Sequence, residues 1–159
     1  MTIIPTIIDP TAVVVAYLLN APAVQQACGV RVAAKHKFAL PTDAASRIAP
    51  DAWPFPSRCL RVQNAGGAPD IDTARQVVEM TITAFGGSQA DAMVAYRALV
   101  TAVRGMVRTR VVLPDAAALL YMLTLTASPV FDYEALTDQV GIDVVTVTVR
   151  AAIAECAIP

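Results

Sequence analysis

Residues 76–85 alternate with a period of two, and this pattern constrains the fold more than any other feature of the sequence. One set of alternate positions is wholly apolar and consists of Val78, Met80, Ile82 and Ala84. The other set is more polar and consists of Val77, Glu79, Thr81 and Thr83. Because successive side chains of a β-strand point to opposite faces of a sheet, the segment predicts a strand with one buried and one half-solvated face.

Other segments predict further strands of a sheet. Residues 144–152 alternate strongly between valine and polar side chains. Shorter apolar runs predict strands at 30–34, 59–63 and 119–127. The Asn, Gly, Pro and Asp residues of 64–70 predict a turn after the second of these strands. The pairs Gly66-Gly67 and Gly86-Gly87 are expected at hairpin ends, where glycine supplies a positive φ.

The first predicted helix follows residue 9. Asp9 is a typical N-cap, and Pro10 suits the first helical position. The side chains expected to form its apolar face are Val13, Val14, Tyr17 and Leu18. Asn20 and Pro22 end this helix, and a shorter helical turn at 23–28 stops at Gly29.

The second predicted helix covers residues 89–104. Ser88, with Asp91 three residues later, resembles a capping box, and Gly105 ends the helix. The side chains expected to face the core are Ala92, Met93, Tyr96, Leu99, Val100 and Val103.

The remaining segments predict connections. These are residues 35–56, with four prolines and one helical turn at 42–48, and residues 106–117 and 129–142. The order of helix, strands, helix and strands predicts an α+β fold, with a mixed, mostly antiparallel sheet and two main helices packed on one face. The 159 residues suit a single domain over 1–159.

Charged residues make up only 16% of the chain, whereas 56% of it is hydrophobic. Soluble domains average about 25% charged residues, so the charge is too sparse for an ordinary monomer surface. Residues 10–30 carry no charge, but Asn, Gln, Pro and Gly interrupt them before the ~20 apolar residues of a membrane span. We expect no membrane contact, a protein that is soluble and intracellular when made, and surplus apolar surface that faces other subunits.

Groups able to do chemistry are scarce. The only histidine, His36, lies between Lys35 and Lys37, which are expected to disfavour its protonation; an exposed loop or a structural position is favoured. The three cysteines, Cys28, Cys59 and Cys156, lack zinc spacing and are expected to be reduced. The net charge of −1 argues against a dedicated nucleic-acid binder. The sequence predicts no catalytic residue, metal or cofactor.

Two charged groups are candidate contact sites. The basic group is Arg104, Arg108 and Arg110. The acidic group is Asp132, Glu134 and Asp138. The arginines either form a rim for DNA or an acidic subunit, or Arg104 complements the helix C-terminus and the other two are solvated. The acidic residues are either contact residues or part of a solvated loop.

Three segments in order carry a family resemblance. The first is the opening helix, Asp9–Pro22, followed by Val30–Val32 and a proline-rich stretch. The second is Arg61–Gly67, the central strand ending in Phe85-Gly-Gly-Ser, and the helix at 89–104. The third is a strand leading to Ser128–Asp132 and the closing strand at 144–150. Together they resemble the tail terminator (tail completion) proteins of long-tailed bacteriophages.

The resemblance implies a mechanical role. Such proteins form a six-membered ring that caps the tail tube, ends tube polymerisation and joins the tail to the head connector. The implied partners are further copies of the chain, the tail tube protein and the head–tail connector protein. DNA would pass through the lumen without sequence-specific binding. The implied location is the tail or neck of the virion, and the host cytoplasm during assembly.

The loops are expected to reach the tube and the connector, because loops vary freely on a fixed scaffold. The candidates are 35–56, 105–114 and 129–142. Deleting residues 132–138 is expected to keep the fold and abolish docking.

Alternatives remain in other classes. One is a head–tail connector (stopper or adaptor) protein of the same neck. Another is a small dimeric ligand-binding α+β domain. A third is a small hydrolase or transferase using Asp132, Glu134 or Cys59, which would require a pocket with a perturbed titratable group.

Overall fold

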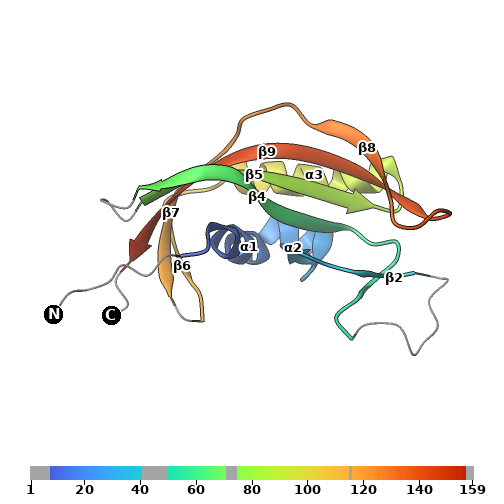
Figure 1. The fold of residues 1–159 in the computed structure, drawn as a ribbon, viewed down its shortest axis with the longest axis horizontal. Coiled ribbons are helices and arrows are strands. Elements are labelled where there is room, and N and C mark those ends of the chain that lie inside the picture. Colours follow the sequence, from blue (N-terminus) through green and yellow to red (C-terminus); the bar gives the residue numbers. More distant parts are fainter. Residues whose placement is uncertain (1–7, 41–49, 71–74, 115, 157–159) are drawn as a thin grey trace.

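A computed structural model describes residues 8–40, 50–70, 75–114 and 116–156 and has an α+β fold (Figure 1). Within these ranges the helices are α1 (Pro10–Asn20), α2 (Pro22–Cys28) and α3 (Gln89–Arg104). The shorter strands are β1 (Val32–Ala33), β2 (Phe38–Ala39), β3 (Trp53–Pro54), β6 (Thr109–Val112) and β8 (Val130–Ala135). The longer strands are β4 (Cys59–Asp70), β5 (Arg75–Gly86), β7 (Ala117–Leu125) and β9 (Gly141–Cys156).

The main sheet is mixed and mostly antiparallel, as predicted. The described strands follow the order β1-β4-β5-β9-β7-β6, and β8 also pairs with β9. Only β1 with β4 is parallel in this sheet, and β2 with β3 forms a separate parallel pair. One edge of β9 pairs with β8 (Val130 opposite Thr146) and then with β7 (Leu125 opposite Val149). Strands β7 and β8 therefore lie end to end along β9.

Strand β5 confirms the period-two prediction. Val78, Met80, Ile82 and Ala84 are all buried on one face. On the other face Glu79 and Thr81 are half-buried, while Thr83 is buried. Because β5 lies between β4 and β9, the apolar face of this strand sits near the middle of the sheet.

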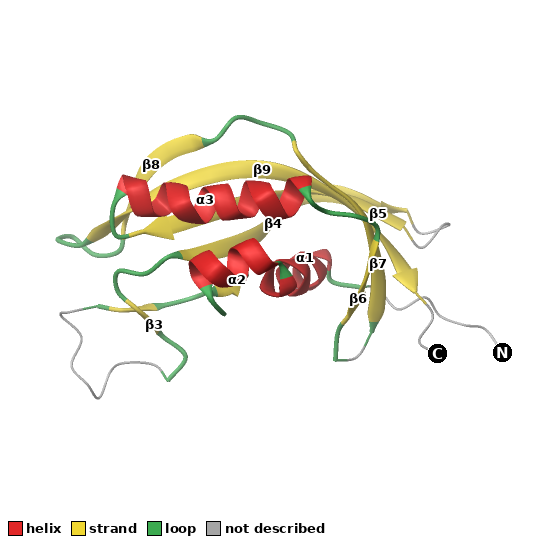
Figure 2. Cartoon of the chain, turned by 180° about the vertical axis from the view of Figure 1, so that it is seen from behind, coloured by secondary structure: helices red, strands yellow, loops and turns green. Residues whose placement is uncertain are grey.

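The helices cover one face of the curved sheet (Figure 2). The predicted caps are present: Asp9 Oδ1 accepts a hydrogen bond from the Thr11 N–H at 2.9 Å, and Ser88 Oγ accepts one from the Asp91 N–H at 3.2 Å. These side chains satisfy N–H groups that have no partner inside the helix. The segment expected to be only a helical turn at 23–28 is the helix α2, which begins at Pro22.

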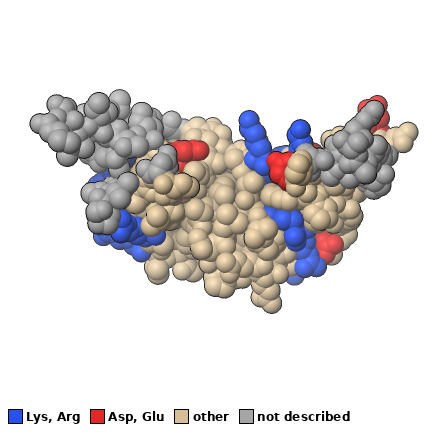
Figure 3. Space-filling model, turned by 90° about the horizontal axis from the view of Figure 1, so that it is seen from below, with Lys and Arg blue, Asp and Glu red and all other residues tan. Residues whose placement is uncertain are grey.

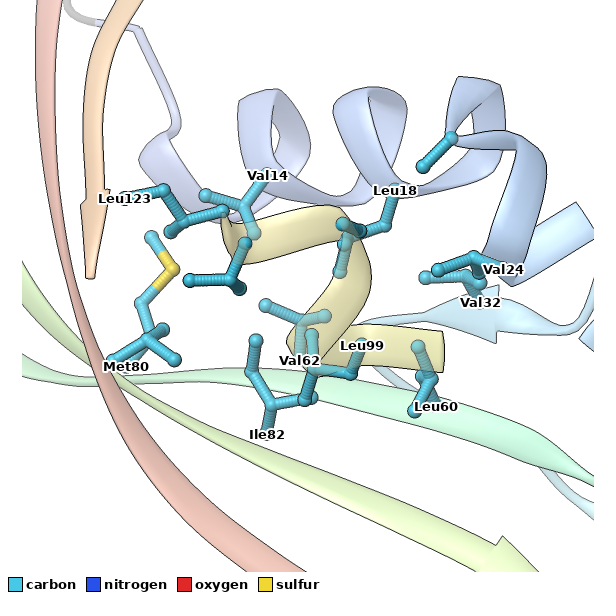
Figure 4. Packing of buried hydrophobic residues seen from close by; sticks show 14 of the residues in the cluster. Val14, Leu18, Val24, Val32, Leu60, Val62, Met80, Ile82, Leu99 and Leu123 are labelled. Carbon is cyan, nitrogen blue, oxygen red and sulfur yellow. The ribbon is translucent and has the colours of Figure 1, made fainter. Parts of the chain in front are cut away.

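The core fills the space between the helices and the sheet (Figure 4). Val14 and Leu18 of α1 and Leu99 of α3 are fully buried against Val62 and Ile82 of the sheet. The expected core residue Tyr17 is only half-buried. Its hydroxyl donates a hydrogen bond to the Ala102 carbonyl at 2.7 Å and so ties α1 to α3.

The buried face of α3 differs in part from the prediction. Ala92, Leu99 and Val103 are buried as expected. The other buried positions are Ala95, Ala98 and Ala102, whereas Met93, Tyr96 and Val100 are half-buried. α3 packs against α2 as well as the sheet, and small side chains allow that second helix to approach closely.

Several segments expected to be connections contain strands. The 106–117 segment holds β6, the 129–142 segment holds β8 and the start of β9, and the 35–56 segment holds β2 and β3. Their backbone groups bond to a partner strand, which a pattern of side chains alone does not reveal. The helical turn expected at 42–48 lies outside the described residues.

Of the glycine predictions, the positive φ is confirmed at Gly66, and the rest need correction. The turn expected at 64–70 is a continuation of β4, with a β-bulge between Asn64 and Gly66, where Gly66 has a φ of 135°. Gly86 and Gly87 do not have a positive φ. Gly86 instead ends β5 directly against the first turn of α3, where a Cβ would overlap the Ala92 backbone nitrogen.

Among the described residues, no single helix is long and apolar enough to cross a membrane; α1 and α2 reach that length and apolarity only together, across an 83° bend.

Candidate interaction surfaces

The predicted arginines lie at the end of the sheet formed by β6 and β7. Arg104 ends α3, Arg108 lies in the following turn, and Arg110 is on β6. All three side chains are exposed. Arg104 and Arg108 border neighbouring hollows that share Tyr121. The structure therefore brings the basic group to one end of the molecule.

Apolar side chains accompany these arginines. Val107 is 72% exposed and Val112 is 71% exposed. We call Val107, Arg108, Arg110 and Val112 the β6 surface. It combines positive charge with two exposed valine side chains.

The predicted acidic group lies on β8 and on the turn that follows it. Asp132 and Asp138 are exposed, and Asp132 Oδ1 accepts a hydrogen bond from the Tyr133 N–H. Glu134 differs: it is half-buried and forms a bidentate ion pair with Arg61. Glu134 thus contributes to holding β8 in place and is not a free contact residue.

Large apolar side chains on β8 are also exposed. Val130, Phe131 and Tyr133 are 61%, 50% and 60% exposed. We call Val130, Phe131, Asp132, Tyr133 and Asp138 the β8 surface. Phe131 also lines a groove against the first turns of α3, whose other lining residues are Gln89, Ala90, Met93, Val94 and Arg97.

A third surface has no charge. Helices α1 and α2 contain no Lys, Arg, Asp or Glu. The view from below shows a broad area without charged side chains, with charged groups toward its two ends (Figure 3). The sparse charge noted in the sequence is therefore concentrated in particular places instead of being spread evenly.

His36 lies in an aromatic cluster, which fits the structural position rather than the exposed one of the two that the sequence favoured. Its ring stacks on the Trp53 ring with 4.7 Å between centroids. It forms T-shaped contacts with Phe38 and Phe85, with 4.7 Å and 4.9 Å between centroids. Burial, and then the nearby positive charge of Arg61, lower the pKa of His36 from 6.5 to about 4, although Glu134 opposes this shift. At neutral pH the ring is uncharged and a weak proton acceptor, which suits a structural role.

Part of this cluster borders an open hollow. Its lining residues are Ala34, Lys35, His36, Lys37, Asp51, Arg61 and Gln63. The buried Nδ1 of His36 has no hydrogen-bond partner within the described ranges. Among all residues that the structure describes, no three His, Cys, Asp or Glu side chains are grouped so that they could hold a metal ion.

Comparison with known proteins bears on the fold. No protein-family model matches this sequence, and no curated protein sequence is similar to it. Among solved structures, a chain of the "virion of native gene transfer agent (GTA) particle" matches with a TM-score of 0.53 and 17% sequence identity. The match covers 91% of this chain and 93% of that chain. The two chains therefore share one fold over nearly their full lengths.

Sequence reasoning missed the apolar members of both surfaces. Val107, Val112, Phe131 and Tyr133 lie in segments that were expected to be connections. The available signal was aromatic and β-branched residues within supposed loops, because such residues favour strands.

Proposed function

We propose that this chain is a structural protein of a phage-like virion, and more specifically a tail terminator. Six copies would form a ring that caps the tail tube, ends tube polymerisation and joins the tail to the head connector. The observation that carries the proposal is the shared fold with a chain of the gene transfer agent virion, over 91% of this chain and 93% of that one.

The distribution of surface residues supports an assembly role over a catalytic one. A closed ring needs two different contact patches on each subunit, and the chain has the β6 surface and the β8 surface on separate edge strands. The tube and the connector would need additional faces. The uncharged face of α1 and α2 is available for one of them.

The lumen of such a ring would pass DNA without sequence-specific binding. Strong phosphate binding requires many Lys and Arg contacts. The chain has 12 Lys and Arg residues against 13 Asp and Glu residues, and three of the arginines form ion pairs with acidic side chains within the described residues. The virion neck would be the final location, with assembly in the host cytoplasm.

The test combines particle mass with electron microscopy. Light scattering over a concentration series, with negative-stain images of the same fractions, is expected to give a hollow six-fold ring. If the protein remains a monomer alone, added tail tubes are expected to nucleate a ring at one end of each tube. A two-fold dimer that leaves tube ends bare would overturn the proposal, and binding to isolated connectors but never to tubes would favour the connector alternative.

Deleting residues 132–138 is not a suitable test of docking, because these residues are part of a strand and not a free loop. The deletion removes most of β8, together with Glu134 and its ion pair to Arg61. We therefore expect it to damage the fold. Substitutions of exposed side chains at Asp132 and Asp138 test the same region without removing a strand.

A further inference from the structure

We propose that the β8 surface of one copy of this chain binds the β6 surface of the next copy, head to tail. The inference rests on the proposed function, because it names the subunit contact that a ring would use. Its occupant is a second copy of the same chain.

Both surfaces are built around a strand with an open edge, together with the residues just before β6 and just after β8. Among the described strands, β6 is the last in its order and pairs only with β7, while β8 pairs only with β9. Exposed edges are commonly protected by charged side chains, especially Lys, or by Pro. The sequences of β6 (TRVV) and β8 (VFDYEA) contain no Lys or Pro, and the charges that they carry are of opposite sign.

The uncovered apolar side chains concentrate at these two places. Eight large hydrophobic residues are exposed within the described ranges, and five of them belong to the two surfaces. The five are Val107, Val112, Val130, Phe131 and Tyr133. Burying them in a subunit contact would remove this apolar area from water, which is the main favourable term in association.

Charge selects which surface binds which. Residues 104–110 contain three arginines and no acidic residue, whereas residues 130–140 contain three acidic residues and no Lys, Arg or His. Contact between two β8 surfaces would place carboxylates against carboxylates, and contact between two β6 surfaces would place guanidinium groups together. Only the pairing of β8 with β6 brings opposite charges together.

The two surfaces are too far apart to meet within one copy. Figures 1 and 2 show β6 and β8 toward opposite ends of the molecule along its longest axis. A contact between different patches repeats from copy to copy, and it closes into a ring when the rotation between neighbours permits. The like charges on each surface disfavour a two-fold dimer built on either surface alone.

The experiment reverses charge on one surface at a time in the full chain. The variant of the β8 surface is Asp132→Lys with Asp138→Lys, and the variant of the β6 surface is Arg108→Glu with Arg110→Glu. Sedimentation velocity is expected to show self-association weakened by about tenfold or more in each. An equimolar mixture of the two variants is expected to recover association, because each then meets a complementary partner.

The matched control is Lys35→Glu with Lys37→Glu, which changes the charge as much as the arginine variant but belongs to neither surface. It is expected to associate like the unchanged chain. Thermal unfolding of every variant shows whether a loss of association reflects a loss of fold. Phe131→Ser, which changes no charge, is expected to weaken association in the same way.

The outcomes separate this inference from the proposed function. If the unchanged chain forms six-fold rings and the charge variants do so equally well, the inference is overturned and the ring proposal stands. If the mixture recovers association but the assemblies are open or ignore tail tubes, the inference stands and the terminator function is overturned. A chain that stays monomeric at every concentration, with or without tubes, overturns both.

Discussion

Arg61 on β4 and Glu134 on β8 form a bidentate ion pair across two intervening strands, β5 and β9. Arg61 Nη1 donates to Glu134 Oε1 at 3.0 Å, and Nη2 donates to Oε2 at 2.9 Å. The same guanidinium lies 4.9 Å from the ring centroid of Phe85. Among the described strands, β8 pairs only with β9. The ion pair adds a contact between β8 and β4, which lies two strands further along the sheet.

Removing the Glu134 charge is expected to destabilise the protein. Glu134→Gln should lower the free energy of unfolding by about 1 kcal/mol, since charge-assisted, partly buried pairs exceed the median surface pair. Chemical denaturation measures the change. The matched control is Glu79→Gln, which breaks a pair with Arg150, whose side chain is 50% exposed. We expect a smaller loss there, and equal losses would contradict a special role for Arg61 and Glu134.

The aromatic cluster around His36 predicts a pH dependence of stability. Burial lowers the pKa of His36 to about 4 in the folded protein, against 6.5 ordinarily. Between these values the unfolded chain binds more protons at this site, so the free energy of unfolding falls as the pH falls from about 6.5 to about 4. In His36→Phe, which keeps a ring in the stack, this part of the decline should disappear. If the free energies of unfolding of the two proteins fall in parallel between pH 6.5 and pH 4, His36 is not held neutral in the folded protein.

Gly86 is expected to tolerate no larger residue. A Cβ at this position would overlap the Ala92 backbone nitrogen, and backbone cannot move aside without shifting α3. Gly86→Ala should therefore lower the free energy of unfolding by about 2 kcal/mol or more. Gly87→Ala is the control, because its Cβ would meet only the Pro56 side chain at 3.0 Å and the Asp91 side chain. Thermal unfolding should rank the two variants clearly, with Gly86→Ala the less stable.

Cys28 and Cys59 are expected to be unreactive in the folded protein. Both are buried and free, and burial raises the pKa of Cys28 to about 11 and that of Cys59 to about 12. The thiolate is the reactive form, so a thiol reagent at neutral pH should modify them only as fast as the protein opens. The measurement uses a Cys156→Ser background with and without denaturant. Rapid labelling of the folded chain would contradict the buried position of these thiols.

The sequence by itself determined the elements whose signals are local. The alternation at 76–85 predicts β5 because a strand pleat alternates its side chains, and Asp9 and Ser88 predict the starts of α1 and α3 because their side chains cap free N–H groups. These predictions hold in the structure. Each depends on residues only a few positions apart.

The tertiary structure alone decided the edge strands and the environments of single residues. The strands β6 and β8 are defined by backbone pairing with β7 and β9, and the local sequence does not show which strand each will pair with. His36 has lysines beside it in the sequence, but folding places Trp53 and Phe85 against its ring. Glu134 likewise meets Arg61 from 73 residues away. Contacts at such separations follow from the order of strands in the sheet, which local propensity does not specify.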